Sequence, residues 1–524
     1  MDARRTVATA IAIADGQVLA VGPADHVLAV SPAGAQREDL AGATIVPGLI
    51  DAHNHLLATG RALAQVQLFD CRSIGEIVER VAGRVRELPP GTWVLGRGWD
   101  ESLLAERRHP TRHDLDPVSP NHPVLLERVW NKLVCNSRAL AIAGVSRDTP
   151  DPSARIAYAG SFERDGDGNP TGLFRDRAKA LIRDHVPSQT HDGELASVEL
   201  ACRAYNAVGL TTVCEPGLYP DEIRTFHHAA RTARLTVRTE LMMAAWGWGG
   251  AEEEADLPYR LGQVGFETGF GDSLLRLGGI KILSDGGIGD RTARVSEPYL
   301  DEPSNHGTWV VDPDDLRRFV RFAHDHGWAI DTHTCGDEAQ AVTVAAYAAA
   351  QEASPKPWLR HRVHHAYFPT DQSLALMAHH RIPAVVSNPF LALLGESFVS
   401  SIGEERARRA MPMRTYLSRG VPLAGSSDSN VSDYDPWFGM YAACTRRTEL
   451  GRVLDAAEAL TAAEALAMYT SGGAYAIGRE HDLGSLEPGK LADLVVLEED
   501  PLAITVEELR TVRPARTMLG GRWV

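Results

Sequence analysis

Val46-Pro-Gly-Leu-Ile-Asp-Ala-His-Asn-His55 is the stretch that decides the fold of this chain. An apolar run over 43–50, interrupted by a Pro-Gly pair, predicts a strand that leads into the two histidines. Because successive side chains of a strand point to opposite faces, His53 and His55 are expected to face the same way. Two imidazoles so placed can bind one divalent cation. The alternative is that they are hydrogen-bonded turn histidines that hold no metal.

Length and composition indicate a soluble globular protein with more than one core. The chain has 524 residues, 44% of them hydrophobic and 23% charged, which predicts a large domain plus a smaller one. With 53 basic and 69 acidic residues the formal charge is −16, which argues against binding to nucleic acid or an anionic membrane. The sequence has no signal peptide, no long apolar span and six scattered cysteines, so we expect a cytoplasmic protein. The sequence does not decide the oligomeric state, and a homo-oligomer is one of the alternatives.

Most of the chain alternates strand-like with helical segments, a pattern that predicts a parallel sheet. Together with the first strand these segments make eight, which fits an α/β fold of the closed (β/α)8 or TIM-barrel type. The later strands are expected at 208–215, 235–243, 275–283, 328–333, 359–365, 382–388 and 421–427.

The two ends of the chain have a different pattern, in which short apolar strands alternate with turn signals. Residues 1–45 and 481–524 are therefore predicted to form one small composite β-sandwich domain. The barrel is expected over 46–480. A stretch at about 66–195, rich in Arg, Asp and Pro, does not fit one βα unit and is predicted to be an insertion that covers the barrel mouth.

Polar residues occur where the predicted barrel strands end, and active sites of such barrels lie at that end. Four of the predicted strands end at or close to such a residue: Lys281, His333, His365 and Asp428. Taken singly, each has an ordinary explanation: a salt-bridged lysine, capped or core histidines, a helix-capping aspartate. Together with the first histidine pair they place candidates on five strand ends in barrel order, which predicts a metal site.

Longer motifs support this interpretation. They are Gly96-Arg-Gly-Trp-Asp100, His122-Pro-Val-Leu-Leu126, Asn136-Ser-Arg-Ala-Leu140, Thr171-Gly-Leu-Phe174, Lys281–Gly286, His333–Asp337 and Gly484-Ser-Leu-Glu-Pro-Gly-Lys-Leu-Ala-Asp493. With the opening stretch, they make the chain resemble amidohydrolase family 3, the YtcJ-like branch of the amidohydrolase superfamily that includes N-substituted formamide deformylases. The resemblance runs nearly end to end and implies a barrel of the amidohydrolase type.

The resemblance also implies a site for one or two divalent metal ions. His53 and His55 would bind one ion, and His333 and His365 would bind a second or complete the site. Lys281 matches a lysine that can become an N-carboxylated, metal-bridging ligand. Nitrogen and oxygen ligands favour zinc but also suit iron, manganese or nickel.

The predicted reaction is hydrolysis of a small molecule by a metal-bound hydroxide, since a divalent cation lowers the pKa of its water to about 7. Asp428 would act as general base and then as general acid toward the leaving nitrogen. His365 is preferred over His364 as ligand and catalytic residue, because the strand period directs only one of them into the lumen. The expected substrate has a non-peptide C–N bond, as in an N-substituted amide, formamide or cyclic amide. A deaminase, an ester or lactone hydrolase, and a metal-poor binding or regulatory relative are the alternatives.

The chain departs from the family pattern at two places. Trp130-Asn131-Lys132 stands where relatives have Asp-Gly-His, so the histidine expected to reach the substrate is missing. Lys132 is either a cation for an anionic substrate or a surface lysine. The usual opening strand is also missing, which predicts either a β-domain one strand short or a misassigned start.

Six residues are candidates for substrate contacts, each with ordinary packing or a surface role as its alternative. Glu215 is either a ligand or substrate contact, or part of a salt bridge at the barrel mouth. The candidates are Trp99, Arg128, Lys132, Glu215, Arg291 and Phe390.

Overall fold

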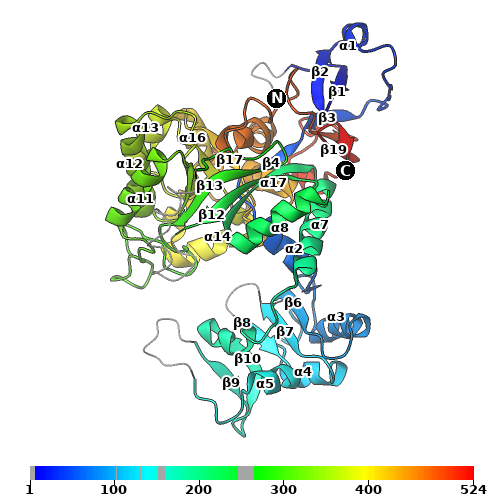
Figure 1. The fold of residues 1–524 in the computed structure, drawn as a ribbon. Coiled ribbons are helices and arrows are strands. Elements are labelled where there is room, and N and C mark those ends of the chain that lie inside the picture. Colours follow the sequence, from blue (N-terminus) through cyan, green and yellow to red (C-terminus); the bar gives the residue numbers. More distant parts are fainter. Residues whose placement is uncertain (1–5, 102, 129–131, 152–159, 246–264) are drawn as a thin grey trace. The chain divides into compact units, whose positions relative to one another are not determined.

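The strands of the central region form one eight-stranded parallel sheet (Figure 1). The structure is a computed structural model, and it describes residues 6–101, 103–128, 132–151, 160–245 and 265–524. The sheet order is β17-β16-β15-β14-β13-β12-β11-β4. The Ala52 backbone N–H donates to the Gly425 carbonyl at 3.1 Å, which joins the two outer strands and nearly closes the sheet. The predicted α/β barrel is thereby confirmed. Its strands are β4 (Leu49–Asp51), β11 (Leu210–Leu218), β12 (Arg238–Ala244), β13 (Leu275–Leu283), β14 (Ile330–Thr334), β15 (Arg362–His365), β16 (Ala384–Val386) and β17 (Leu423–Gly425).

Amphipathic helices alternate with these strands. In α11 the Asp312 side chain accepts from the Asp314 N–H and caps the helix, while Leu316, Phe319 and Val320 share its buried face. The main helices of this region are α7 (His191–Ala207), α8 (Pro220–Arg231), α11 (Pro313–Asp325), α12 (Asp337–Ala353), α13 (Asp371–His380), α14 (Pro389–Ile402) and α17 (Pro436–Thr445). Shorter ones are α2 (Leu56–Leu63), α15 (Glu404–Arg408), α16 (Met413–Ser418), α18 (Ala462–Ala467) and α19 (Gly473–Ala476).

One glycine is required where β13 meets β14. Gly279 has φ +141°, which L side chains rarely adopt. A Cβ atom there would lie 2.2 Å from the Ala329 carbonyl oxygen. Only glycine therefore lets these two strands run side by side at the register that carries Lys281 and His333.

Strands from the two ends of the chain pair with each other. Within the same compact unit as the barrel, β3 (Thr44–Pro47) joins β18 (Leu494–Leu497), β19 (Arg516–Leu519) and β20 (Arg522–Trp523) in a four-stranded sheet. A two-stranded sheet, β1 (Ala10–Ala14) and β2 (Gln17–Gly22), precedes α1 (Ala24–Val30). Ile11 and Ile13 of β1 pack against a core of Leu494, Val496 and Met518. Figure 1 shows these terminal elements grouped together. The domain limits at 45 and 481 stay predictions.

Residues 60–197 form a second compact unit, around the stretch predicted as an insertion. Its six-stranded sheet has the order β5-β6-β7-β8-β10-β9. One hydrophobic core includes Ile77 and Val81 of α3, and another includes Ala139 and Leu140 of α5. That this unit covers the barrel mouth stays a prediction. Its elements are β5 (Val66–Gln67), α3 (Ile74–Glu87), β6 (Val94–Trp99), α4 (Arg112–Leu115), β7 (Val124–Arg128), β8 (Lys132–Cys135), α5 (Ser137–Ala143), β9 (Phe162–Arg164), β10 (Pro170–Arg175) and α6 (Ala180–Arg183).

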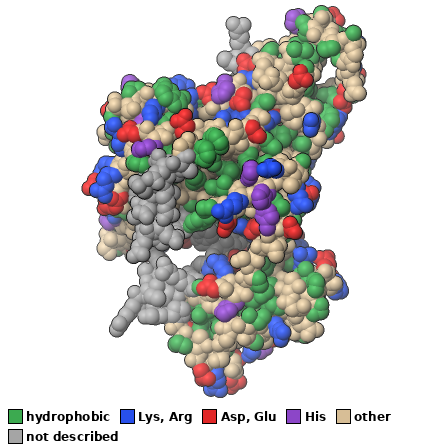
Figure 2. All heavy atoms as spheres, in the orientation of Figure 1, with side chains coloured by type: hydrophobic (Ala, Val, Ile, Leu, Met, Phe, Trp, Pro, Cys, Tyr) green, Lys and Arg blue, Asp and Glu red, His purple; other side chains and the backbone are tan. Residues whose placement is uncertain are grey.

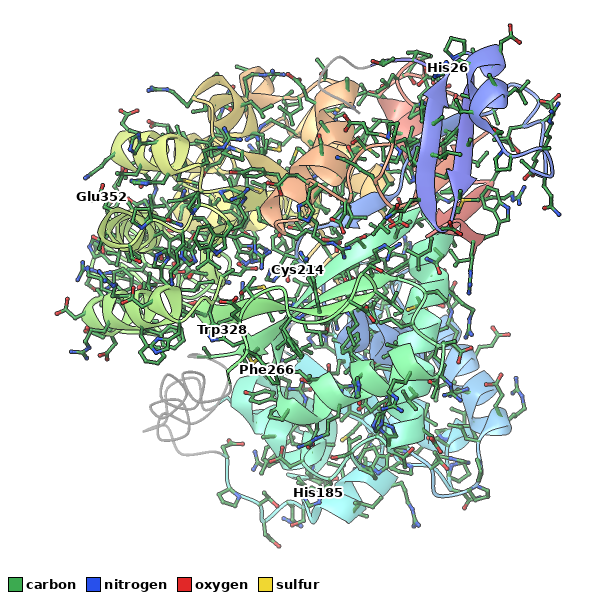
Figure 3. The ribbon with its side chains drawn as sticks, turned by 45° about the horizontal axis from the view of Figure 1, so that its top comes forward. His26, His185, Cys214, Phe266, Trp328 and Glu352 are labelled. Atoms are coloured by element: carbon green, nitrogen blue, oxygen red, sulfur yellow. The ribbon has the colours of Figure 1, made fainter. Side chains whose placement is uncertain are left out.

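The interior and the surface differ in the expected way. Cys214 on β11 is fully buried with Ile50 and Met242, and Figure 3 shows it well inside the barrel unit, with His26 and Glu352 at the periphery. Acidic and basic side chains are interspersed over the face seen in Figure 2. Among the described residues, no helix is both long and apolar enough to span a membrane.

Candidate metal centre

The two histidines of the opening stretch meet at Asp428. Strand β4 ends at Asp51, so both lie in the turn that follows, and the prediction that a strand pleat aligns them is wrong. Backbone pairing aligns them instead: the His55 N–H donates to the Ser429 carbonyl at 2.7 Å, and the Asp428 N–H donates to the His53 carbonyl at 2.9 Å. Asp428 Oδ1 consequently lies 3.6 Å from His53 Nε2 and 3.3 Å from His55 Nε2.

A buried carboxylate beneath this turn holds the two ends of the barrel sheet together. Asp51 accepts hydrogen bonds from the Ser427 N–H at 3.1 Å, the Ser427 hydroxyl at 2.5 Å and Asn54 Nδ2 at 2.9 Å. Burial raises the pKa of Asp51 to about 6, against the effect of these donors. The loops that carry His53 and Asp428 are thus fixed to each other.

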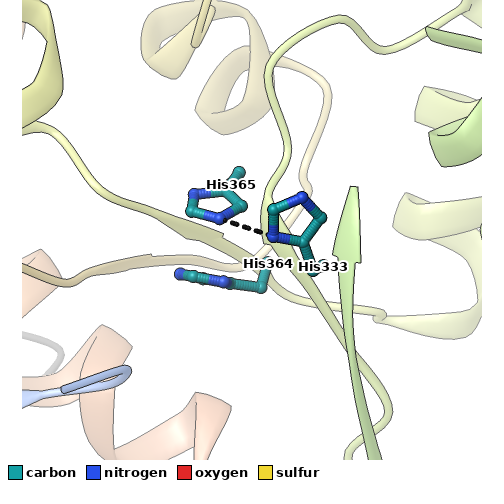
Figure 4. A group of neighbouring side chains, drawn as sticks. All are labelled: His333, His364 and His365. Carbon is teal, nitrogen blue, oxygen red and sulfur yellow. Dashed lines mark hydrogen bonds between the residues drawn. The ribbon is translucent and has the colours of Figure 1, made fainter. Parts of the chain in front are cut away.

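His333 and His365 form a second pair on the other side of Asp428. His333 Nδ1 lies 3.0 Å from His365 Nε2 (Figure 4), and Asp428 Oδ2 lies 4.0 Å from the same nitrogen. The other nitrogen of His333, Nε2, lies 3.1 Å from the Gly286 carbonyl oxygen. Asp428 therefore has one oxygen directed at each histidine pair.

Lys281 lies buried beside a carboxylate that the sequence analysis did not single out. Its Nζ is 3.5 Å from Asp331 Oδ1, and Asp331 Oδ2 lies 3.0 Å from His53 Nδ1. A signal for Asp331 did exist: it precedes His333 by two residues on β14, and alternation puts both on one face.

His364 is the second residue that the sequence analysis placed differently. We expected only one of His364 and His365 in the lumen, but the ring of His364 lies 3.3 Å from that of His53 and 3.8 Å from that of His365. The reason is that His365 has φ +66°, which ends the extended backbone on which strand alternation depends. Both histidines therefore face candidate ligands of other strands.

Burial and neighbouring charges set the protonation of the site. Burial, aided by the charge of Lys281, lowers the pKa of His53 and of His333 to about 4. Burial would lower the pKa of His55 too, but the hydrogen bond and charge of Asp428 raise it overall. The same hydrogen bond holds the pKa of Asp428 well below its usual range, although burial opposes this. At neutral pH His53 and His333 are thus neutral imidazoles and Asp428 is an ionised carboxylate, the forms that bind metals.

The hydrogen-bond pattern supplies an independent test of whether these residues fit a metal ion. Because a carboxylate only accepts, the His53 Nδ1 that faces Asp331 carries the proton and Nε2 has the lone pair. That lone pair faces Asp428 Oδ1, another acceptor, at 3.6 Å. Two acceptors directed at each other are stabilised by a cation between them, so the arrangement fits a divalent metal.

In the part of the chain that the structure describes, three overlapping groups of side chains have ligand atoms within 4.8 Å of one another. They consist of nitrogen and oxygen donors, which suit zinc. His365 Nδ1 is also buried with no hydrogen-bond partner among the residues described. The groups are His333, His364 and His365; His53, Asp331 and His364; and His53, His55 and Asp428.

The candidates for substrate contacts in the barrel unit occupy different settings. The ring of Phe390 lies 5.8 Å from that of His365. Glu215 accepts hydrogen bonds from the Leu56 and Leu57 N–H groups at the start of α2, and burial raises its pKa to about 8. Glu215 therefore anchors the backbone next to His55.

Arg291 holds a loop together. It pairs with Glu302 and donates to the Leu300 carbonyl at 3.2 Å and the Ser400 carbonyl at 3.4 Å. These bonds engage its guanidinium with the chain itself, so a substrate contact through Arg291 stays a prediction.

The remaining candidates belong to the 60–197 unit. Trp99 is fully buried there, Arg128 Nε donates to Glu101 at 2.6 Å, and Lys132 Nζ donates to Glu101 at 3.2 Å. Lys132 is thus a partly buried, paired cation. Trp130 and Asn131 lie outside the described residues.

Comparison with known proteins agrees with this geometry. The sequence model of the Amidohydrolase family, Amidohydro_3, matches residues 36–524. The chain is 31% identical over 497 residues to the Bacillus subtilis (strain 168) protein YtcJ. The alignment covers 93% of this chain and 89% of YtcJ. It is 29% identical over 540 residues to an N-substituted formamide deformylase of Arthrobacter pascens. That alignment covers 99% of this chain and 95% of the deformylase.

A solved structure shares the fold over almost the whole chain. It is a metal-dependent hydrolase from Pyrococcus furiosus, with a TM-score of 0.75, 28% sequence identity, and coverage of 94% of this chain and 95% of that one. Because the family match and these relatives extend over nearly the full length, the chain belongs to the amidohydrolase family and is a metal-dependent hydrolase of carbon–nitrogen bonds other than peptide bonds.

Proposed function

We propose that this enzyme hydrolyses the C–N bond of a small N-substituted amide, with N-substituted formamides as the first class to test and cyclic amides as the next. The observation that carries the proposal is the position of Asp428, with one carboxylate oxygen directed at His53 and His55 and the other at His365. The similarity to the Arthrobacter pascens deformylase over 99% of the chain supports the choice of substrate class.

The proposed metal centre draws on every strand end that carries a candidate. A divalent ion, with zinc as the first choice, supplies Lewis acidity: it lowers the pKa of water and polarises a carbonyl. Lys281 is proposed to contribute after N-carboxylation, because a carbamate is an anionic oxygen ligand whereas an ammonium repels a cation. The proposed ligands are His53, His55, Lys281, His333, His365 and Asp428.

Asp428 is proposed to move the proton. Its Oδ1 is engaged by His55 Nε2 at 3.3 Å, whereas Oδ2 lies 4.0 Å from His365 Nε2, so Oδ2 is the oxygen that we assign to proton transfer. Asp428 is ionised at neutral pH and accepts the proton of the attacking water at Oδ2. The leaving nitrogen of the tetrahedral intermediate is far more basic than a carboxylate, so the proton passes from Oδ2 to that nitrogen as the C–N bond breaks.

His365 is proposed to act beside Asp428 and to orient the substrate carbonyl. Its ring is buried against Phe390, with a ring separation of 5.8 Å, and against Tyr367, with a ring separation of 5.3 Å. This packing limits the imidazole to a narrow range of orientations. The aromatic side chains also exclude water from one side of the site.

Metal analysis tests the proposal first. Protein purified without chelators or added metal is expected to contain one to two equivalents of a transition metal, and His53→Ala/His55→Ala is expected to lose it. His379→Ala/His380→Ala, a histidine pair on α13, is the matched control and should keep the wild-type content. A wild-type protein that binds no metal, even after reconstitution with zinc or manganese plus bicarbonate, would overturn the proposal.

Kinetics test the proton transfer. With an N-substituted formamide or amide that the wild type hydrolyses, Asp428→Asn is expected to lower kcat by about 10²- to 10⁴-fold, the usual contribution of a general acid–base. Asp312→Asn, which alters the exposed cap of α11, should leave kcat unchanged. Wild-type kcat in Asp428→Asn would contradict the assigned role.

A further inference from the structure

We propose that Asp285 is a positioning residue of the metal centre, which fixes the loop that holds His333 in the orientation and tautomer of a metal ligand. The inference rests on the metal-dependent function proposed above. It adds to the six proposed ligands a residue that acts through one of them. It comes from the way in which the loop after β13 and the loop after β14 hold each other.

Asp285 is a fully buried residue whose carboxylate accepts hydrogen bonds from the backbone of two other segments. It lies two residues after the end of β13. Its Oδ1 accepts from the Cys335 N–H at 3.1 Å, and its Oδ2 accepts from the Gly336 N–H at 2.8 Å and the Arg294 N–H at 2.9 Å. Cys335 and Gly336 directly follow β14, the strand of His333. The side chain of Asp285 therefore fixes the backbone just beyond His333.

The backbone next to Asp285 in turn holds the imidazole of His333. The Gly286 carbonyl oxygen lies 3.1 Å from His333 Nε2, and Cys335 Sγ lies 3.4 Å from the same nitrogen. Because a carbonyl only accepts, at every pH, Nε2 carries the proton and the lone pair of the neutral ring is on Nδ1. That Nδ1 faces His365 Nε2 at 3.0 Å in the centre (Figure 4).

Residues 284–286 and 333–336 thus form a reciprocal clamp. Ser284 completes it, because its N–H donates to the His333 carbonyl at 3.3 Å and its hydroxyl donates to the same oxygen at 2.5 Å. The packing leaves little room for adjustment, since a Cβ atom at Gly336 would lie 1.8 Å from the Arg294 carbonyl oxygen. Outer partners of this kind set the orientation and basicity of metal-binding histidines. A change at Asp285 is therefore expected to reach the metal through His333.

An amide at position 285 cannot replace the carboxylate. Both oxygens of a carboxylate accept, whereas an amide has one acceptor and one NH2 group. Whichever way the amide is turned, Asp285→Asn directs its NH2 group at the N–H of either Cys335 or Gly336. Two donors that face each other leave a buried N–H without an acceptor, so the loop after β14 has to shift.

Asp493 offers a matched control within the same compact unit. It is buried and also accepts from a backbone N–H, that of Gly520 at 2.7 Å, while its other partner is Arg238. Asp285→Asn and Asp493→Asn therefore make the same chemical change at a buried acceptor of a backbone N–H. Only the first change lies in the clamp.

The experiment measures zinc affinity by competition with a chromophoric chelator at pH 8, above the value of about 7 to which burial raises the pKa of Asp285. The absorption spectrum of the cobalt-substituted enzyme reports the geometry of the centre, which a loss of stability alone does not change. Asp285→Asn is expected to raise the zinc dissociation constant about 10-fold and to change the cobalt d–d bands, whereas Asp493→Asn should stay within about 2-fold of the wild type. A folded Asp285→Asn with wild-type affinity and spectrum, or equal losses in both variants, would overturn the inference and leave the proposed function intact.

A second variant keeps the test decisive if Asp285→Asn does not fold. Asp285→Ser is smaller and places no NH2 group against the backbone donors, and it should change the zinc affinity and the cobalt bands in the same direction. Wild-type values in Asp285→Ser would then overturn the inference.

Failure of the wild type to bind zinc would instead overturn the proposed function, and the metal-free enzyme then tests the clamp. Nitrogen NMR of isotope-labelled histidine rings, with the His333 signal assigned by its loss in His333→Gln, reports the tautomer. The wild type is expected to hold His333 with the proton on Nε2, and Asp285→Asn is expected to show a mixture of tautomers. The same single tautomer in both proteins would overturn the inference.

Discussion

Asp331 is a buried carboxylate that connects His53 to Lys281 in the candidate centre. It is fully buried, accepts from His53 Nδ1 at 3.0 Å and lies 3.5 Å from Lys281 Nζ. Burial would raise its pKa, but the charge of Lys281 and the hydrogen bond from His53 hold that pKa well below its usual range. Asp331 is therefore a permanent negative charge behind the histidine that faces Asp428.

Asp331→Asn is expected to raise the zinc dissociation constant by about 10- to 100-fold, because an outer partner fixes the orientation and basicity of a metal-binding histidine. An amide can also donate to His53 Nδ1 and so favour the wrong tautomer. Chelator competition measures the change, with the surface variant Asp314→Asn on α11 as the control. Equal affinities for Asp331→Asn and wild type would show that Asp331 does not orient His53.

Among the secondary-structure elements, α17 has a cap with an unusual charge state. Asp435 accepts from the Trp437 N–H at 2.9 Å at the start of this helix. Burial raises the pKa of Asp435 to about 6, and the charge of Asp433 acts in the same direction. The hydrogen bond from the Trp437 N–H opposes this shift. The folded state therefore prefers the protonated carboxyl, and the stability that this residue contributes is present at low pH and is lost as pH rises from about 4 to about 6.

Asp435→Asn is expected to stabilise the protein above pH 7 by about 1–3 kcal/mol, because asparagine caps a helix as well as aspartate but has no charge to bury. At pH 5, in the middle of the range from about 4 to about 6, the gain should be about half as large. Thermal unfolding of both proteins at pH 5 and pH 7.5 gives the comparison. A difference that does not change with pH would exclude the buried charge as its cause.

At the scale of the whole molecule, one buried ion pair joins the barrel to the terminal sheet. Arg238 of β12 donates to Asp493 through Nε at 2.6 Å and through a terminal nitrogen at 2.8 Å. Asp493 precedes β18 and also accepts from the Gly520 N–H at 2.7 Å. The pair thus connects a barrel strand to two segments from the end of the chain.

Arg238→Met is expected to lower the free energy of unfolding by about 3–5 kcal/mol, because it leaves a buried carboxylate without its counter-ion. The double variant Arg238→Met/Asp493→Asn should lose less than the sum of the single variants. Urea denaturation measures these values. Arg203→Met removes the exposed pair with Glu199 on α7 and should cost at most about 1 kcal/mol. Additive losses in the double variant would show that the buried pair does not couple the two regions.

Much of the fold could be predicted because its signals are local. The alternation of strand and helix identified the barrel, since each element must bury one face and parallel strands need crossover helices. The strands expected at 275–283 and 328–333 correspond to β13 and β14. A compact unit extends over 60–197, and the insertion at about 66–195 stays a prediction. Strand ends were less certain, because tertiary hydrogen bonds decide where a strand stops.

The composition of the centre could be predicted only in part. Lys281, His333, His365 and Asp428 stand at strand ends that the sequence itself marks, and the structure brings them together. Asp331 was missed, and His364 was placed beside His365 but outside the lumen, although both lie on predicted strands. Strand alternation could have indicated Asp331, whereas it argued against His364.

The sequence by itself determined the fold class, the family and the order of candidate residues around the barrel, because periodicity and motif spacing are properties of the chain. The tertiary structure alone decided which side chains meet. The positive φ of His365 brings His364 into the centre, and pairing between the β4 and β17 loops directs His53 and His55 at Asp428. Such contacts depend on backbone reversals and on hydrogen bonds between distant segments, which no local pattern in a sequence specifies.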